Sequence, residues 1–305
     1  MKLLLTGAFN YTEKQLVELQ DLGYDITFIQ DEREEVSFDV SEYEVVVCNN
    51  LFLYNDISKF KKLKVIHLTS AGLDRVPLNY IKENKIQLYN AKNVYSVPMA
   101  EWVVLKILEI YKKSKVFWKN QENHTWKKER ELFELTNKNI GIIGFGDVGT
   151  EVSKRLKAFG TNITAINRSK VDSKYIDKYV SLSELDNVLP EVDIIILTVA
   201  STPETKHLIN KQQLNLMHNN AVLINVARGD LINQEELIKS LDDNKFLGVA
   251  LDVFEEEPLV YSSPLWDYEN VYITPHNSFV SETNNGNLYN VFWNNLKTIK
   301  NYTWK

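Results

Sequence analysis

Short apolar runs alternate with amphipathic stretches over residues 1–90 of the chain. Each apolar run has the length of a buried strand, and the stretches between the runs repeat apolar positions at helical spacing. We expect strands at residues 2–6, 26–29, 45–49, 65–69 and 87–89, and helices at residues 13–22 and 57–63. This alternation predicts an α/β fold, in which an open parallel sheet carries helices on both faces.

A helix of a different character is expected at residues 99–114. The stretch is apolar around most of the helix, which is typical of a helix that is buried against several neighbours. Because it separates two series of strands and helices, we expect it at a domain or subunit interface. Residues 117–135 carry Trp118, Trp126 and many charges, and they predict a mobile connection.

The second half of the chain repeats the alternation of strands and helices. Strands are expected at residues 140–143, 163–166, 194–198, 221–225, 247–251 and 272–274, and helices at residues 151–158, 182–189, 211–216 and 234–241. A last helical pattern over residues 287–300 is expected to cross back to the first half.

The strand at residues 140–143 runs into Gly144-Phe145-Gly146-Asp147-Val148-Gly149 and then into a helical pattern. Glycines at this spacing between a strand and a helix form the fingerprint of a dinucleotide-binding turn. The first makes the tight turn, the second lets a pyrophosphate approach the backbone, and the third lets the helix pack close to the strand. The phosphates would lie at the helix N-terminus. The alternative is a glycine-rich turn in another α/β unit.

Arg228, Glu257 and His276 each come shortly after a different strand of the second half. Because parallel strands end at one edge of a sheet, these side chains are expected to converge. An imidazole can protonate a carbonyl oxygen as hydride reaches the carbon, and a neighbouring carboxylate favours the imidazolium. An arginine offers paired donors to a carboxylate or ketone. The alternatives are a surface ion pair, a solvated acid and a structural loop histidine.

The turn Ser70-Ala71-Gly72-Leu73-Asp74 follows a strand of the first half. Its small residues expose backbone N–H groups, which predicts a site for a carboxylate. An ordinary turn between a strand and a helix is the alternative.

Composition narrows the classes of function. The chain has 305 residues, a net charge of −6 and no basic stripe, which argues against nucleic-acid binding. The one cysteine, Cys48, lies in an apolar run, so we expect a buried strand residue and neither a disulfide nor a metal site. No run is long enough for a signal peptide or a membrane span, so we expect a cytoplasmic protein without a membrane partner.

The chain resembles the D-isomer-specific 2-hydroxyacid dehydrogenases, a family that includes glyoxylate/hydroxypyruvate reductases and phosphoglycerate dehydrogenases. The resemblance rests on residues 70–74, 144–149, 225–229, 251–258 and 274–276. It implies two doubly wound parallel-sheet domains and, commonly, a homodimer joined through the nucleotide domain and its leading helix. A Rossmann nucleotide domain, residues 99–280, would be inserted in a flavodoxin-like substrate domain, residues 1–98 and 281–305.

The resemblance also implies roles in hydride transfer between a nicotinamide cofactor and a small 2-oxo acid. Arg228 would bind and polarise the 2-oxo acid, and Glu257 would pair with the proton donor His276. The backbone N–H groups of Ala71 and Gly72 would bind the substrate carboxylate, and Asp252 would contact the nicotinamide carboxamide. The cofactor-binding residues would be Gly144, Phe145, Gly146, Asp147, Val148, Gly149, Asn167, Arg168, Ser169, Lys170, Thr198, Val226, Ala227 and Asp252.

One departure from the family pattern bears on the cofactor. NAD-dependent members carry an acid at the end of the second strand of the nucleotide domain, where this chain has Asn167. Arg168, Ser169 and Lys170 follow with donors and positive charge. The loss of a carboxylate that would repel a 2′-phosphate favours NADP(H), with NAD(H) as the alternative. A second departure is Asn277-Ser278, where many relatives have small apolar residues.

Substrate identity is predicted from fewer residues. Residues 51–54 (Leu-Phe-Leu-Tyr) are expected in a loop that overhangs the site, and Trp266 is expected at its rim or from a partner subunit. These residues favour an apolar or bulky 2-oxo acid over a phosphorylated one. Two alternative functions remain open: a formate or phosphite dehydrogenase, and a nucleotide-sensing interaction protein like the corepressors that resemble this family.

Overall fold

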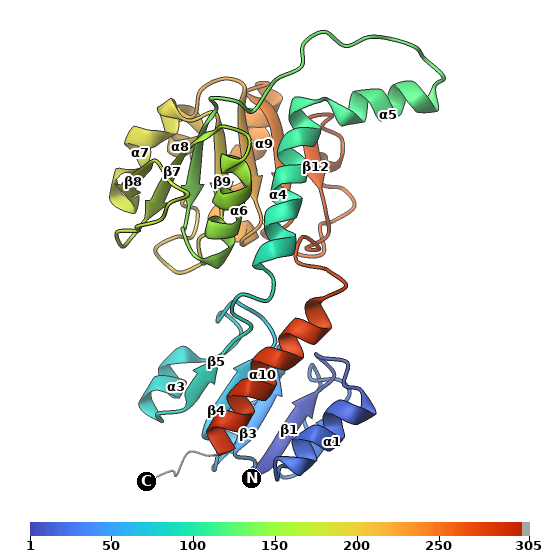
Figure 1. Cartoon of the computed structure of the whole chain (residues 1–305), viewed down its shortest axis with the longest axis vertical. Helices are drawn as coiled ribbons and strands as arrows, with labels where there is room; N and C mark the ends of the chain where they lie inside the picture. Colours follow the sequence, from blue (N-terminus) through green and yellow to red (C-terminus); the bar gives the residue numbers. More distant parts are fainter. Residues whose placement is uncertain (301–305) are drawn as a thin grey trace. The chain divides into compact units, whose positions relative to one another are not determined.

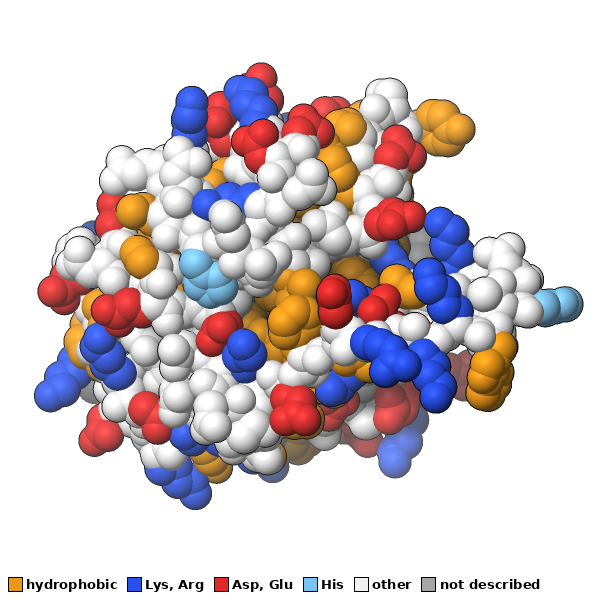
Figure 2. Space-filling view, turned by 90° about the horizontal axis from the view of Figure 1, so that it is seen from above, with side chains coloured by type: hydrophobic (Ala, Val, Ile, Leu, Met, Phe, Trp, Pro, Cys, Tyr) orange, Lys and Arg blue, Asp and Glu red, His pale blue; other side chains and the backbone are white. Residues whose placement is uncertain are grey.

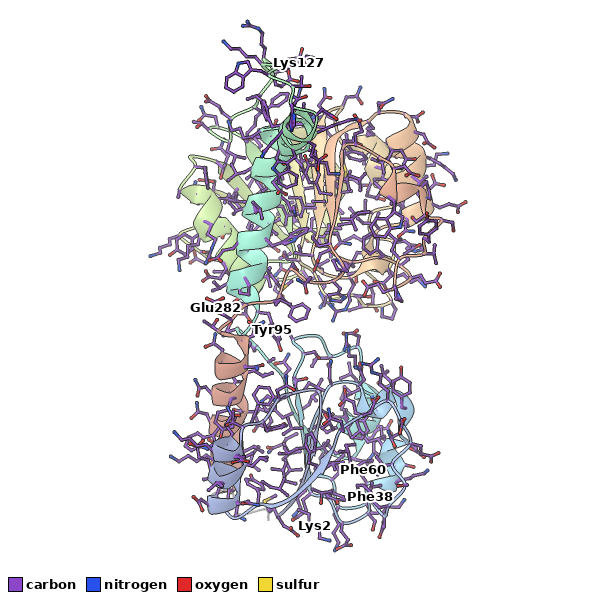
Figure 3. All side chains as sticks on the ribbon, turned by 90° about the vertical axis from the view of Figure 1, so that its right-hand side faces the viewer. Lys2, Phe38, Phe60, Tyr95, Lys127 and Glu282 are labelled. Atoms are coloured by element: carbon purple, nitrogen blue, oxygen red, sulfur yellow. The ribbon has the colours of Figure 1, made fainter. Side chains whose placement is uncertain are left out.

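The computed structural model describes residues 1–300. The chain forms two compact units: a first unit of Met1–Tyr95 with Ser281–Lys305, and a second unit of Ser96–Val280. The chain passes between them twice, next to Tyr95 and Glu282, which Figure 3 labels.

The first unit contains a parallel sheet of five strands in the order β2-β1-β3-β4-β5. Successive side chains of a strand point to opposite faces. Leu3 and Leu5 therefore pack beneath one pair of helices, and Leu4 contributes to the core on the other face. The strands are β1 (Lys2–Thr6), β2 (Asp25–Ile29), β3 (Val45–Cys48), β4 (Val65–Leu68) and β5 (Gln87–Tyr89), and the helices are α1 (Glu13–Asp21), α2 (Leu51–Tyr54), α3 (Leu78–Glu83) and α10 (Asn284–Lys300).

Helix α10 lies along the sheet of the first unit (Figure 1). Its Phe292 is fully buried, and the backbone carbonyl of Leu296 accepts a hydrogen bond from the Tyr24 hydroxyl at 2.8 Å. The amide of Asn295 donates to Nε2 of the buried His67 at 3.0 Å. The last helix thus supplies part of the core of the unit in which the chain begins.

The second unit contains a parallel sheet of seven strands in the order β12-β11-β10-β9-β6-β7-β8. Helices α4 and α6 cover one face and α7, α8 and α9 cover the other. The strands are β6 (Asn139–Ile143), β7 (Asn162–Asn167), β8 (Lys178–Ser181), β9 (Ile194–Leu197), β10 (Ala221–Asn225), β11 (Phe246–Leu251) and β12 (Val271–Ile273). The helices are α4 (Ser96–Tyr111), α5 (Ser114–Glu122), α6 (Asp147–Lys157), α7 (Leu185–Val188), α8 (Lys211–Leu216) and α9 (Gln234–Asp242). The expected fold of two parallel-sheet α/β units is confirmed.

Three local expectations are wrong. The first part of the expected connection at residues 117–135 belongs to helix α5. The helix expected at residues 57–63 is a single 3₁₀ turn, Ile57–Lys59, where the carboxylate of Asp56 accepts the N–H of Ser58. The expected loop at residues 51–54 is helix α2, because Leu51 and Phe52 are buried in the core of the first unit.

Cys48 is a free, buried residue of β3, as its apolar neighbours predict. Burial raises the pKa of its thiol. None of the helices within residues 1–300 is long and apolar enough to cross a membrane. The cytoplasmic location stays a prediction.

Candidate active site

Three neighbouring strands of the second unit end side by side. Asn225 at the end of β10 pairs with Leu251 at the end of β11, and Leu251 pairs with Ile273 at the end of β12. The segments that carry Arg228, Glu257 and His276 therefore leave the sheet from adjacent points of one edge.

His276 and Glu257 form a hydrogen-bonded pair. Nδ1 of His276 lies 2.8 Å from Oε2 of Glu257, and the two side chains are 30% and 36% exposed. The second oxygen of Glu257 accepts the backbone N–H of Phe254 at 3.1 Å. With Nδ1 donating to the carboxylate, Nε2 is the ring nitrogen that remains for a substrate.

Arg228 contributes positive charge to the same pair. Burial raises the pKa of Glu257, but the hydrogen bonds from His276 and Phe254, with the charges of His276 and Arg228, lower it overall. Glu257 is therefore an ionised carboxylate at neutral pH.

Gly229 explains how the arginine segment approaches the acid segment. A Cβ at Gly229 would lie 1.8 Å from the backbone carbon of Phe254, so the two chains pass in contact. Any side chain at this position would push the segments that carry Arg228 and Glu257 apart. The structure thus brings Arg228, Glu257 and His276 together, as expected from their positions after three strands.

Asp252 holds the segment that carries His276. Its side chain is fully buried, and its carboxylate accepts the backbone N–H groups of Asn277 and Ser278 at 2.8 and 3.0 Å. The hydroxyl of Thr274 also donates to it, at 2.5 Å. His276 itself has a φ of 52°, in the left-handed region that non-glycine residues rarely adopt. Asp252 therefore stabilises an uncommon turn, and its contact with a nicotinamide stays a prediction.

The three glycines between β6 and α6 are needed for different structural reasons. Gly144 has a φ of 89°, and a Cβ there would lie 2.4 Å from the backbone of Val199. A Cβ at Gly149 would lie 2.8 Å from the carbonyl oxygen of Gly144, which allows the close packing of helix and strand. A Cβ at Gly146 would meet nothing within 4 Å. The open space over Gly146, at the N-terminus of α6, fits the pyrophosphate of a dinucleotide.

A cavity of about 380 Å³ lies beside this turn. Among the described residues that line it, Arg168 is the one that carries a charge. The expected cofactor residues in its lining are Gly144, Phe145, Gly146, Asn167, Arg168 and Thr198. The sequence missed Ile166, Leu182, Val199, Ala200, Thr202 and Thr205, most of which follow β9 and could have been found by the strand-end argument used elsewhere.

The side chain of Asn167 holds the loop that carries Arg168 through two hydrogen bonds. Its side-chain oxygen accepts the N–H of Phe145 at 3.4 Å, and its side-chain nitrogen donates to the carbonyl of Ser169 at 3.0 Å. A carboxylate at this position could not make the second bond, because it has no donor. The side chain of Asn167 thus orders both the turn at residues 144–149 and the start of the loop at residues 168–170.

The other expected cofactor residues lie outside the cavity lining. Val226 is buried in the core, and Ala227 donates its N–H to the side chain of Asn225 at 3.0 Å. Ser169 and Lys170 are exposed, and Asp147 and Val148 are the first residues of α6. Their contacts with a cofactor stay predictions.

In the first unit, the turn after β4 keeps the carbonyl groups of Ala71 and Gly72 occupied. Asn90 donates to the carbonyl of Ala71 at 2.6 Å, and the Ser70 hydroxyl donates to that of Gly72 at 3.0 Å. Within residues 1–300, no acceptor is recorded for the N–H groups of Ala71 and Gly72. These N–H groups are the ones expected to bind a substrate carboxylate.

Comparison with known proteins identifies the family of the chain. Residues 104–278 match the sequence model of the NAD binding domain of D-isomer specific 2-hydroxyacid dehydrogenases. The chain belongs to this family. The match to an NAD-binding domain, with the open glycine turn, supports a nicotinamide cofactor.

Individual relatives show how far the similarity extends. The chain is 35% identical to a D-3-phosphoglycerate dehydrogenase of Methanocaldococcus jannaschii over 74% of this chain and 43% of that protein. It is 30% identical to a glyoxylate/hydroxypyruvate reductase of Arabidopsis thaliana over 80% and 75%, respectively. The crystal structure of a glyoxylate reductase from Paecilomyes thermophila superposes with a TM-score of 0.87 at 25% identity, over 99% of this chain and 95% of that one. The chain thus spans less than half of the first relative and three quarters of the second.

A cavity of about 370 Å³ in the first unit holds none of the expected site residues. It lies among residues 36–41 and 55–61, next to Phe38 and Phe60, which Figure 3 labels. Because neither the strand-end residues nor the glycine turn reach it, it forms no part of the candidate active site of this family member.

Proposed function

We propose that the protein is an NAD(P)-dependent D-2-hydroxyacid dehydrogenase that reduces a small 2-oxo acid. The observation that carries this proposal is the hydrogen bond between His276 and the ionised Glu257, with Arg228 close enough to lower the pKa of that acid. The family contains reductases of this kind, so the proposed reaction agrees with the comparisons.

The roles of the side chains follow from their chemistry. When bound, the reduced nicotinamide supplies a hydride to the carbonyl carbon. Nε2 of His276 gives a proton to the carbonyl oxygen, so the 2-oxo acid gains one hydride and one proton and becomes a 2-hydroxy acid. Glu257 accepts the hydrogen bond from Nδ1 and fixes the orientation of the ring. Arg228 binds the carboxylate or the carbonyl oxygen and stabilises the negative charge that develops there.

We also propose that the N–H groups of Ala71 and Gly72 bind the carboxylate of the substrate. Their carbonyl groups are already bonded within the first unit, which leaves the N–H groups as donors for an anion. A carboxylate accepts such backbone donors well, because two adjacent N–H groups form a small anion-binding concavity.

We further propose NADP(H) as the preferred cofactor. Arg168 is the charged residue in the described lining of the nucleotide cavity, and Asn167 stands where an acid would repel a 2′-phosphate. An arginine binds a phosphate through paired donors, which favours the phosphorylated cofactor.

A homodimer is proposed from the surface of the second unit. Helix α5 and the segment after it expose Val116, Phe117, Trp118, Trp126 and Leu132. Figure 2 shows this projecting segment at the right, with hydrophobic and basic side chains along it. Exposed apolar residues of this extent mark a protein contact, and a second copy of the chain is the partner that the family favours.

The test is the initial rate of 2-oxo acid reduction with NADPH and NADH side by side. We expect turnover of glyoxylate, 2-oxo-isocaproate or phenylpyruvate, and a higher kcat/KM with NADPH. A higher value with NADH would refute the proposed cofactor preference and keep the enzyme class. Tight cofactor binding without turnover of any 2-oxo acid would refute the enzyme and support a nucleotide-sensing protein. Turnover of formate or phosphite alone would support the other alternative.

A further inference from the structure

Arg75 connects the two turns at the carboxyl edge of the first unit's sheet. It follows Ala71 and Gly72 in the segment after β4, and its Nη1 donates to the side-chain oxygen of Asn50 at 2.9 Å. Asn50 lies just after β3, the neighbouring strand, whose end is in register with that of β4. The guanidinium is therefore held at the same edge as the N–H groups proposed for the substrate carboxylate.

The recorded side-chain partner of Arg75 is neutral. Other arginines of the chain face acids, as Arg155 does with Glu151 and Glu101, and Arg33 with Asp31. For Arg75, no ion pair with a carboxylate is recorded among residues 1–300. A guanidinium has five donors, and a single amide oxygen leaves most of them for another acceptor.

The buried carboxylate of Glu32, in the same region, already accepts several hydrogen bonds. The carboxylate of Glu32 is 5% exposed and accepts the Thr6 hydroxyl at 2.7 Å. It also accepts the backbone N–H groups of Asn49 and Asn50, at 2.9 and 2.5 Å. Glu32 thus fixes the backbone on which the Arg75 contact rests, and its oxygens are engaged by donors other than the arginine.

An unmet polar group lies next to this contact. The side-chain oxygen of Asn49 is buried without a hydrogen-bond partner among the described residues. An amide side chain carries both a donor and an acceptor, so Asn49 can serve as either. A buried polar group without a partner calls for a further hydrogen-bonding group, such as a water, an ion or a ligand atom.

We propose that Arg75 binds a second anionic group of the substrate, so that the enzyme prefers 2-oxo acids with a distal carboxylate or phosphate. This inference rests on the proposed function, because the substrate's own carboxylate would occupy the N–H groups of Ala71 and Gly72 on the same segment. A guanidinium recognises carboxylate and phosphate through the same paired donors.

The inference differs from the expectation of an apolar substrate side chain. That expectation depended on residues 51–54, of which Leu51 and Phe52 are buried in the core and Leu53 and Tyr54 are exposed. Arg75 adds a guanidinium to this edge, beside the exposed Asp74 of the same turn.

The experiment compares substrates that share a carbon chain and differ in the distal charge. The pairs are 2-oxoglutarate with 2-oxovalerate, and 3-phosphohydroxypyruvate with hydroxypyruvate, each with the full-length enzyme and saturating NADPH. We expect a higher kcat/KM for one or both charged members. Arg75→Gln should lower kcat/KM for that member by about 10- to 100-fold, as for loss of a charged hydrogen bond, and change the uncharged member by less than about threefold. The pair that responds identifies the carboxylate or the phosphate as the distal group.

Two further variants separate binding from folding. Arg75→Lys keeps the charge and loses the paired donors, so it should restore part of the lost kcat/KM. Arg33→Gln changes an exposed arginine of the same unit, paired with Asp31, and should change neither substrate. Thermal unfolding of each variant is recorded beside the kinetics.

Three results would overturn the inference. An equal loss for the charged and uncharged members would assign Arg75 to the carboxylate that all 2-oxo acids share. No preference in the wild type, with no effect of Arg75→Gln, would show that the arginine contacts no substrate. Absence of turnover with every 2-oxo acid and either cofactor would instead refute the proposed function, and this inference with it.

Discussion

The backbone carbonyl of Asp252 accepts the backbone N–H of His276 at 2.7 Å, while its carboxylate binds the residues on either side of the histidine. The position of the imidazole therefore depends on a buried acid that does not contact the ring. Two groups then orient His276: Glu257 through the ring and Asp252 through the backbone.

Asp252→Asn is expected to impair catalysis by moving this turn. An amide in place of the carboxylate would direct an NH₂ group at a backbone donor and leave that donor unpaired, at a cost of about 1–3 kcal/mol. Displacement of the imidazole should lower kcat by about 10- to 100-fold. Thermal unfolding and kcat measure the two effects, and Asp267→Asn, at an exposed position, is the control.

The same variant tests the predicted contact of Asp252 with the nicotinamide. If Asp252 acts through the turn alone, the Kd of the cofactor should stay near the wild-type value while kcat falls. A large rise in Kd would instead support a direct contact with the cofactor.

His276→Ala is expected to remove most of the turnover and leave cofactor binding close to normal. Loss of a general acid costs about 10²- to 10⁴-fold in rate. Stopped-flow reduction measures the rate, and quenching of protein fluorescence measures cofactor affinity. Wild-type turnover in this variant would contradict the proposed mechanism.

Two alanine variants of the turn at residues 144–149 are expected to lose different properties. Gly146→Ala meets no neighbouring atom, so stability should stay near wild type while cofactor affinity falls by at least about tenfold. Gly144→Ala places a Cβ against Val199 in a left-handed conformation and should lose about 2–4 kcal/mol of stability. Calorimetry and cofactor titration separate the two. Unchanged affinity in Gly146→Ala would argue against a pyrophosphate at this turn.

Asn167→Asp is expected to shift cofactor preference toward NADH. The new carboxylate would repel a 2′-phosphate and accept ribose hydroxyl groups, and kcat/KM with NADPH should fall by about tenfold or more. Arg168→Gln should lower kcat/KM with NADPH and change that with NADH little. Lys174→Gln, outside the cavity lining, is the control. No change of the NADPH to NADH ratio in either variant would refute the proposed role of this loop.

Much of the fold followed from the sequence, because buried strands leave strong local signals. The isoleucines of β9 and the valines of β3 form uninterrupted apolar runs, and the glycine turn has a fixed spacing. Helices α2 and α5 were missed for opposite reasons. Leu51 and Phe52 form too short an apolar pair to show helical period, and α5 buries no side chain that would create one.

The site was predictable where it depends on strand ends, and not where it depends on hydrogen bonds across the chain. The convergence of Arg228, Glu257 and His276 was predictable because each follows a strand. The bond from Arg75 to Asn50 joins residues 25 positions apart, and no local pattern indicates it. Similarly, the hydrogen bond from the N–H of Ser278 to Asp252 could be predicted only with knowledge of the register between β11 and β12.

His67 predicts a specific dependence of stability on pH. Burial lowers its pKa to about 4, and its neutral ring accepts a hydrogen bond from Asn295 of α10 at Nε2. The unfolded chain binds a proton at this residue below a pH of about 6.5, whereas the folded chain does not until about pH 4. The contribution of His67 to stability is therefore fully present above pH 6.5 and is lost as the pH falls toward 4. Between pH 7.5 and pH 5 this loss amounts to about 2 kcal/mol.

The measurement is urea unfolding of the wild type and His67→Gln at both pH values. Other groups titrate in both proteins, so the difference between the two isolates His67. The wild type should lose about 2 kcal/mol more than the variant on acidification. His124→Gln, which changes an exposed histidine, should follow the wild type. An equal loss in the wild type and His67→Gln would show that the imidazole is solvated enough to protonate in the folded state, and that its contact with Asn295 does not hold it neutral.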